Sequence, residues 1–253
     1  MAESLARRVL RKLLPPVILD AYRILRGLST PAAKPPHALV KPAAKAPPKT
    51  NSTVGLKPPQ QPKPADDPDF LFDGSGDRFK ELMQGVKVYA EYGVGKSSSY
   101  VLRKTEAQVL AVDTDADWIS KVREEVSNTD RFDAVHVDLG PMKGWGWPVD
   151  YQHHARFQDY TDSVWTRGLS PELVLVDGRF RVCCFLTSLL KAEPGTILIF
   201  DDYVKRPHYH IVEEFTRPTE VHGRQAIFIR PDQNELDLHV LAQQVERFRY
   251  VMD

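Results

Sequence analysis

Four residues between positions 91 and 97 have types and a spacing suited to binding a nucleotide-like ligand. They lie in the run E-Y-G-V-G-K-S, where Glu91 and Ser97 flank Gly93 and Gly95. Glycines let a backbone approach a ligand closely, because they carry no side chain. A carboxylate ahead of them suits a ligand with an ammonium group and a ribose. A dinucleotide-binding turn would have a third glycine at position 98, which is serine here.

Further carboxylates follow the apolar runs downstream. Asp113 ends A-Q-V-L-A-V-D, 18 residues after the last of these glycines. A carboxylate accepts hydrogen bonds in pairs, which suits the two hydroxyls of a ribose. Later apolar runs end at Asp138, at Asp177 and at the pair Asp201 and Asp202. Because parallel strands end at one edge of a sheet, we expect these acids to border one crevice; helix capping would explain only one or two of them.

Positioning these residues requires strands that alternate with helices. The expected strands are 86–91, 107–113, 133–138, 171–177 and 196–201, and the expected helices are 79–83, 99–104, 116–127, 157–165, 182–190, 209–215 and 235–250. Residues 139–170 interrupt the alternation. We expect their Gly- and Trp-rich first part to be irregular and a short helix to follow it. Residues 220–230 indicate a hairpin. The predicted fold class is α/β, a doubly wound, Rossmann-like sheet that is mostly parallel, with a C-terminal antiparallel hairpin and helices on both faces.

The run E-Y-G-V-G-K-S resembles motif I of the class I S-adenosylmethionine (SAM)-dependent methyltransferases, whose pattern is E/D-x-G-x-G-x-S/T. The resemblance extends from about Phe79 to Pro231. It implies that SAM is the cofactor and that six residues bind it. The methionine end and the turn of SAM would be held by Glu91, Gly93, Gly95 and Ser97, the ribose hydroxyls by Asp113, and the adenine amino group would lie near Asp138.

Two later stretches, V-L-V-D-G-R-F-R and I-F-D-D-Y, are similar to the macrocin O-methyltransferase family. That resemblance implies that Asp177, Asp201 and Asp202 bind Mg²⁺, which would hold neighbouring hydroxyls of a sugar. Three oxygen donors with open coordination positions suit this ion. The mutual repulsion of the acids could instead be offset by a raised pKa on one of them, or by Arg179 or Arg206 folding over the cluster.

Arg179 stands where the macrocin family has an aspartate, its supposed general base, so the base must be sought elsewhere. We predict Asp177, His208 and Arg179 as the catalytic residues, with His208 as a base that titrates near neutral pH. Other histidines that could serve are His153, His154 and His210. Arg179, Arg181 and Arg206 could also clamp a carboxylate, sulfate or phosphate group of the substrate.

The predicted function is SAM-dependent O-methylation of a small-molecule or saccharide hydroxyl, an activity of EC 2.1.1 type. One alternative is a nicotinamide-dependent oxidoreductase or nucleotide-sugar enzyme on a similar sheet, against which the missing third glycine and Glu91 count. Another is a non-catalytic binding module that keeps the SAM fold as a scaffold.

The charge of the chain is divided unevenly, although its net value is zero. Residues 1–69 hold 12 Lys and Arg against five Asp and Glu, and 31–69 contain 11 of the 20 prolines. We expect a basic amphipathic helix over 1–30 that contacts a membrane surface or a protein, a disordered linker over 31–69, and the methyltransferase-like domain over 70–253. The linker lacks aromatic residues for stacking, so no nucleic acid is expected as a partner. Two adjacent cysteines give no disulfide framework, and no apolar run approaches the roughly 20 residues of a membrane span, which predicts a cytoplasmic protein.

Overall fold

The computed structural model describes residues 67–253, apart from residue 128. The predicted helix over 1–30 and the predicted linker up to residue 66 lie outside the described residues. Asp69, which we expected to belong to the linker, is held by helix α4 (Lys96–Lys104). Its carboxylate lies 3.3 Å from Arg103 and 2.9 Å from Lys104. The folded domain therefore includes residues that precede the expected boundary at position 70.

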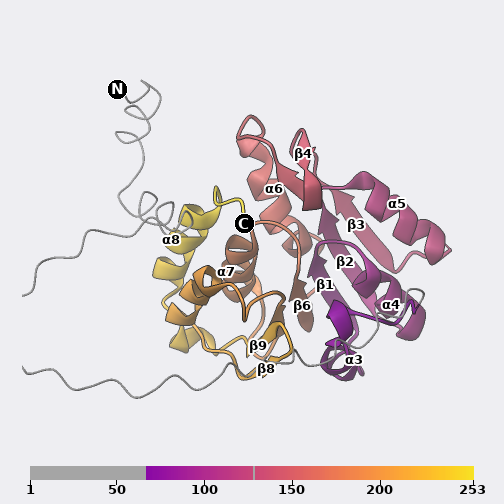
Figure 1. Cartoon of the computed structure of the whole chain (residues 1–253). Helices are drawn as coiled ribbons and strands as arrows, with labels where there is room; N and C mark the ends of the chain where they lie inside the picture. Colours follow the sequence, from indigo (N-terminus) through magenta and orange to yellow (C-terminus); the bar gives the residue numbers. More distant parts are fainter. Residues whose placement is uncertain (1–66, 128) are drawn as a thin grey trace, which may run out of the picture. The chain divides into compact units, whose positions relative to one another are not determined.

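A seven-stranded sheet forms the centre of the domain, with the strand order β3-β2-β1-β6-β7-β9-β8 (Figure 1). The strands are β1 (Val88–Tyr92), β2 (Gln108–Asp113), β3 (Phe132–His136), β6 (Leu173–Val176), β7 (Ile197–Phe200), β8 (Glu220–His222) and β9 (Gln225–Ile229). The first five of these pair in parallel, whereas β9 runs antiparallel to both β7 and β8. The predicted doubly wound sheet with a C-terminal antiparallel hairpin is confirmed.

Helices cover both faces of the sheet, because the strands alternate their apolar side chains between two cores. In β2, Leu110 and Val112 belong to one core, while Val109 and Ala111 belong to the other. The first core is completed by α6 (Phe157–Asp162), α7 (Arg181–Lys191) and α8 (Leu238–Phe248), and the second by α3 (Asp77–Leu82), α4 and α5 (Ala116–Glu125). Of the helices described, none has both the length and the apolar character needed to cross a bilayer.

The stretch between β3 and β6 contains regular structure where we expected an irregular loop. Met142–Lys143 (β4) and Trp147–Pro148 (β5) pair as a small antiparallel sheet. Gly146 permits the reversal between them, since its φ of 71° is a value that glycine adopts without strain. Two expected α-helices also differ: the one over 157–165 ends as the 3-10 turn Ser163–Trp165, and Pro207–Glu214 (η5) is a 3-10 helix.

The strand order reverses beside β1. The chain runs outward from β1 to β2 and β3, and then crosses back to place β6 and β7 on the other side of β1. Open α/β sheets bind ligands at such a reversal, in the crevice outside the carboxyl ends of the strands. The turn after β1 and the ends of β2 and β6 therefore frame the expected ligand site.

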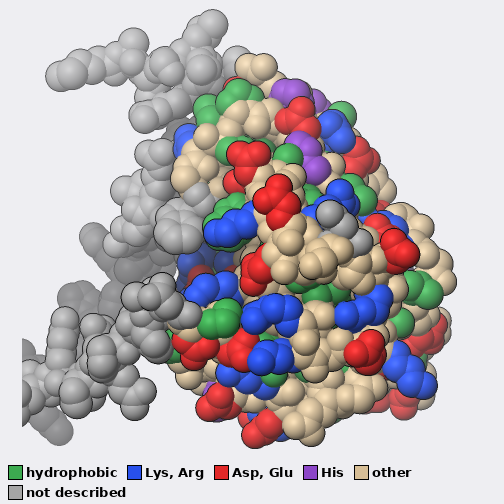
Figure 2. Space-filling view, turned by 90° about the vertical axis from the view of Figure 1, so that its right-hand side faces the viewer, with side chains coloured by type: hydrophobic (Ala, Val, Ile, Leu, Met, Phe, Trp, Pro, Cys, Tyr) green, Lys and Arg blue, Asp and Glu red, His purple; other side chains and the backbone are tan. Residues whose placement is uncertain are grey.

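One face of the molecule is shown in Figure 2. Among its described side chains, Lys and Arg are intermixed with Asp and Glu, and neither sign gathers into a broad field.

Candidate active site

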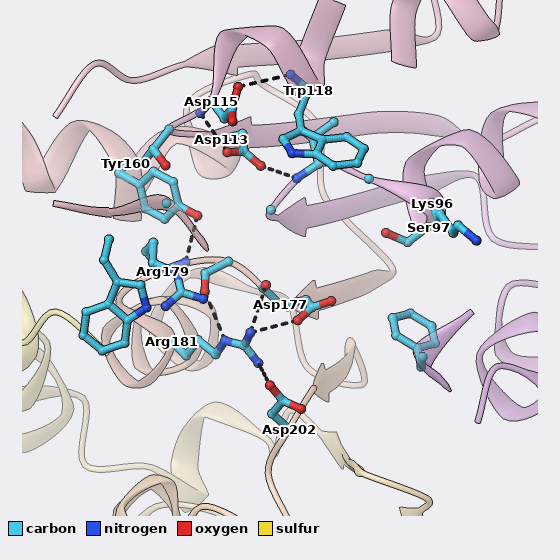
Figure 3. A pocket seen from close by; sticks show the side chains of 18 of the residues that line it. Lys96, Ser97, Asp113, Asp115, Trp118, Tyr160, Asp177, Arg179, Arg181 and Asp202 are labelled. Carbon is cyan, nitrogen blue, oxygen red and sulfur yellow. Dashed lines mark hydrogen bonds and ion pairs between the residues drawn. The ribbon is translucent and has the colours of Figure 1, made fainter. Parts of the chain in front are cut away.

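A cavity of about 650 Å³ opens at the carboxyl ends of β1, β2, β6 and β7 (Figure 3). Small-ligand pockets commonly have volumes of roughly 300–1,000 Å³. One end of the cavity is formed by the turn after β1 and by the residues that follow β2, and the other by the residues that follow β6 and β7. The predicted site residues that line it are Gly93, Gly95, Ser97, Asp113, Asp177, Arg179 and Asp202.

Glycines allow the ends of β1 and β6 to approach each other closely. Gly93 has a φ of 95°, and a Cβ atom on it would lie 3.0 Å from the Cα of Gly178. A Cβ atom on Gly178 would in turn lie 2.8 Å from the backbone nitrogen of Gly93. A side chain at either position would push the two strand ends apart. Gly178, which we did not single out from the sequence, is therefore as necessary for this close approach as Gly93.

Glu91 lies beneath the turn and does not line the cavity. Its carboxylate is fully buried and accepts hydrogen bonds from the hydroxyls of Tyr89 at 2.9 Å, Ser97 at 2.8 Å and Ser98. Ser98 also accepts a hydrogen bond from the amide of Gly95 at 3.0 Å. Burial raises the pKa of Glu91 to about 7, although the three hydroxyls oppose the shift. In this position Glu91 holds the first turn of α4, whereas we expected it to hold the methionine end of the cofactor.

Asp113 joins the glycine turn to the end of β2. Its Oδ2 accepts a hydrogen bond from the amide of Val94 at 2.5 Å, and its Oδ1 accepts one from the amide of Asp115 at 2.9 Å. Burial raises the pKa of Asp113, and these backbone donors oppose the shift. A carboxylate oxygen accepts more than one hydrogen bond, so Asp113 can still receive ribose hydroxyls from the cavity that it lines.

Trp118 lines the cavity and is a site residue that the sequence did not indicate. Helical periodicity places it on the apolar side of α5, yet its side chain is 44% exposed. The carboxylate of Asp115 caps α5, because it accepts hydrogen bonds from the amides of Asp117 at 2.9 Å and Trp118 at 3.2 Å (Figure 3). An exposed indole close to Asp113 offers an aromatic face for a planar base.

Asp138 and His208, both predicted as site residues, lie outside the cavity lining. Asp138 follows β3, the outer strand of the sheet, and the hydrogen bond from the amide of Gly140 at 2.9 Å lowers its pKa. His208 is exposed on η5, with its ring centre 4.4 Å from that of Tyr209. Partial burial and the charge of Arg206 lower the pKa of His208. The structure brings neither side chain to the cavity.

Arginines surround the acids that follow β6 and β7. Arg181 lies 2.9 Å from a carboxylate oxygen of Asp177 and 3.5 Å from one of Asp202 (Figure 3). Arg206 lies 2.7 Å from the same oxygen of Asp202. Of the two arginines that we considered for this role, Arg206 folds over the acids and Arg179 does not.

Asp201 is the fully buried member of this group. Its Oδ1 accepts hydrogen bonds from the Nε of Arg224 at 2.9 Å and from the side-chain amide of Gln225 at 3.0 Å. Burial and the charge of Asp201 raise the pKa of Asp177. Over residues 67–253, no three Asp, Glu, His or Cys side chains converge on a point where a metal ion could bind. Asp177, Asp201 and Asp202 therefore do not fit the expected magnesium site, because arginines already pair with their oxygens.

Arg179 differs from the other arginines of the cavity. It is only 9% exposed, and its guanidinium lies 5.2 Å from the centre of the Trp147 ring. Its backbone amide donates to the hydroxyl of Tyr160 at 3.1 Å. Among the described residues, its guanidinium has no hydrogen-bond or ion-pair partner. Burial and the nearby charge of Arg181 lower the pKa of Arg179.

Solved structures of methyltransferases resemble this domain. A methyltransferase-like protein from Silicibacter pomeroyi DSS-3 is 28% identical with a TM-score of 0.62, and the match covers 76% of this chain and 98% of that one. An O-methyltransferase from Bacillus cereus, solved with S-adenosylhomocysteine (SAH), is 14% identical with a TM-score of 0.41 over 68% of this chain and 82% of its own. No protein-family model matches the chain, and no curated protein matches it significantly. The domain has the fold of the class I SAM-dependent methyltransferases, as the resemblance of its glycine turn implies.

Proposed function

We propose that this protein transfers a methyl group from SAM to an oxygen of a small molecule or saccharide, an activity of EC 2.1.1 type. The observation that carries the proposal is the position of the glycine turn, residues 93–97. This turn lies where the strand order reverses, and its Val94 amide donates a hydrogen bond to Asp113. The likeness to the S. pomeroyi methyltransferase-like protein supports it.

SAM would lie across the ends of β1 and β2. Gly93 and Gly95 leave room for its methionine part, because they place no side chain in the cavity. Asp113 would accept hydrogen bonds from the ribose hydroxyls, and Trp118 would stack on the adenine. Glu91 would contribute indirectly, by holding the start of α4 in place.

The chain would supply the orientation of the acceptor and the removal of its proton. SAM, when bound, supplies a methyl group that its sulfonium makes electrophilic. Asp177 is the lining carboxylate that follows β6, next to the glycine turn, and its side chain stays 27% exposed. Arg181 holds one of its oxygens, and burial beside Asp201 raises its pKa, which makes Asp177 a stronger base for an acceptor hydroxyl.

The alternative of a nicotinamide-dependent enzyme receives no support from the turn. A dinucleotide pyrophosphate needs open backbone amides at the start of the helix after β1. Ser98, in place of the third glycine, is buried there and bonded to Glu91. The first turn of α4 is thus filled by the protein's own side chains.

Calorimetric titration with SAH, compared with NAD, tests the cofactor assignment. We expect SAH to bind in a one-to-one complex and NAD not to bind. Binding of NAD alone would favour the oxidoreductase, and binding of neither would contradict the proposal. Incubation with labelled SAM and a fractionated lysate then identifies the acceptor. SAH binding without transfer to any fraction would favour the non-catalytic module.

A further inference from the structure

At the end of the cavity formed after β6 and β7, three arginines pair with acids and a fourth arginine does not. The paired groups there are Asp177, Asp201 and Asp202 on one side and Arg181, Arg206 and Arg224 on the other. Arg179 is a fourth arginine on this part of the lining and stands outside that network. Among the described residues, Arg179 is therefore the arginine at this end of the cavity whose guanidinium has no hydrogen-bond or ion-pair partner.

A guanidinium that is largely removed from solvent and makes no ion pair is unfavourable, so the position of Arg179 on a cavity wall needs a physical reason. The acid that acts on Arg179 electrostatically, Asp253, makes no ion pair with it. The hydroxyl of Tyr160 fixes the backbone of Arg179, and the ring of Trp147 lies against its guanidinium. The charge is thus held in position before any ligand arrives, as a preformed binding group requires.

We propose that Arg179 and Trp147 form a subsite for an oxyanion on the acceptor, a carboxylate, phosphate or sulfate group. A guanidinium binds each of these through paired N–H···O hydrogen bonds. Of the three arginines that we considered for binding an anion, Arg181 and Arg206 are already paired with aspartates. Arg179 is the one that remains. A neutral saccharide would leave that charge without a partner.

This inference rests on the proposed methyl transfer and narrows its acceptor to an anionic molecule. Arg179 follows Asp177, the proposed base, by two residues, and both line the same cavity. The anionic group would therefore lie close to the hydroxyl that is methylated. The acceptor class is a hydroxylated carboxylic acid, phosphate ester or sulfate ester.

The first test adds sodium phosphate, sulfate or acetate, at constant ionic strength, to the full chain saturated with SAH. A bound anion raises the midpoint of thermal unfolding by mass action. We expect the rise in the wild type and in Arg156→Gln, a matched control at an exposed arginine outside the cavity lining, and not in Arg179→Gln. A rise that persists in Arg179→Gln, or no rise in the wild type, would overturn the subsite.

The second test examines the methylated product from labelled SAM and lysate. We expect the labelled product to bind an anion exchanger, and loss of that retention after phosphatase or sulfatase treatment distinguishes an ester from a carboxylate. With this acceptor, Arg179→Gln should raise KM roughly 10- to 100-fold, with a smaller effect for Arg179→Lys. A labelled product that is neutral overturns the subsite and leaves the methyltransferase proposal intact. Failure of SAH to bind overturns the methyltransferase proposal instead.

The thermal stability of Arg179→Gln distinguishes an anion-binding role of Arg179 from a purely structural role. If Arg179 only packs against Trp147, Arg179→Gln should lower the unfolding midpoint of the SAH-free protein. If the charge is kept for a ligand, relief of the repulsion with Arg181 offsets part of the lost contact with Trp147, and the unfolding midpoint should change little. A clear loss of stability in Arg179→Gln would overturn the proposal.

Discussion

Three aspartates after β6 and β7 are balanced by three arginines from separate parts of the chain. Arg181 begins α7, Arg206 precedes η5, and Arg224 lies in the turn between β8 and β9. Together they pair with the three carboxylates and offset much of their negative charge, as a divalent cation would otherwise do. The same acids can therefore mark a metal site in one chain and an ion-pair network in another.

Arg224→Ala is expected to lower the free energy of unfolding by about 3–5 kcal/mol, because it leaves Asp201 buried without its main partner. Arg217→Ala is the matched control. Its side chain is 82% exposed and bridges Glu213 at 3.4 Å, a surface pair worth about 0–1 kcal/mol. Denaturant unfolding measures both variants. Equal, small effects would show that Arg224 does not stabilise the buried acid.

A chelator is expected to leave methyl transfer and SAH binding unchanged, since arginines already pair with Asp177, Asp201 and Asp202. Activity assays with and without a chelator, followed by addition of magnesium, check this. Activity that disappears with the chelator and returns with magnesium would contradict the ion-pair network. It would restore the magnesium site that the macrocin resemblance implies.

Because of Glu91, we expect the free energy of unfolding to fall as the pH rises. Its folded-state pKa is about 7, above the ordinary value of 4.5, so the folded state keeps the proton that the unfolded state loses between these values. This contribution is complete below pH 4.5 and lost by about pH 7, and it amounts to about 3 kcal/mol. Glu91→Gln should remove that part of the slope, whereas Glu124→Gln, at an exposed position of α5, should keep it. Unfolding measured from pH 4 to 8 tests the difference, and equal slopes in both variants would refute it.

Asp113→Ala should weaken SAH binding by about 1.5–3 kcal/mol, the contribution of hydrogen bonds to a charged group. It removes the acceptor of both the ribose hydroxyls and the Val94 amide. Asp138→Ala is the comparison, because Asp138 lies outside the cavity lining and should matter less. Calorimetry with SAH measures both. A larger loss with Asp138→Ala would support the adenine contact that the resemblance implies.

At the scale of elements, continuous apolar runs predicted the parallel strands well, because strands buried on both faces need them. Leu173–Val176 is fully apolar and forms β6 at the position expected. The strands β4 and β5 have two residues each, too few for any periodicity to show. The glycine turn was also predicted, because the residues that define it are close together in the sequence.

The roles of the site residues were harder to predict. Some bind side chains that are distant in the sequence, and others point in a direction that the sequence does not indicate. Arg224 lies 23 residues after Asp201, and only the hairpin brings them together. Glu91 was identified from its place before the glycines, but its inward direction depends on Ser97 and Ser98 in the following helix. Asp138 shared the strand-end pattern, yet its strand lies at the edge of the sheet, away from the reversal.

Gly178→Ala tests the close approach of β1 and β6. Its Cβ would meet the hydroxyl of Tyr160, and it would lie 2.8 Å from the nitrogen of Gly93 and 2.9 Å from the carbonyl carbon of Tyr92. The backbone atoms cannot move aside as a side chain can. We expect a loss of about 1–3 kcal/mol in stability and weaker SAH binding. Gly144→Ala is the control, since a Cβ there meets nothing within 4 Å. Unfolding and calorimetry measure both, and a Gly178→Ala variant that behaves like the control would refute the requirement.

At the scale of the whole molecule, the domain includes a segment just before its first helix. Leu71 is buried in the core that contains Phe79, and the rings of Phe72 and Phe79 lie 5.3 Å apart. Leu71 and Phe72 also line the cavity. Arg224 links this segment to the acid cluster, because it lies 3.0 Å from Asp73 as well as bonding Asp201.

These contacts predict where the chain can be shortened. A chain of residues 67–253 should fold and bind SAH like the full chain, because the composition of 1–66, rich in proline and lysine, cannot support a core of its own. A chain that begins at Gly76 should lose at least about 2 kcal/mol of stability, since it lacks the buried side chain of Leu71. It should also bind SAH more weakly, because part of the cavity wall is missing. Unfolding and calorimetry on the two shortened chains and the full chain decide the point: a 67–253 chain that does not fold would show that residues 1–66 are a structural part of the domain.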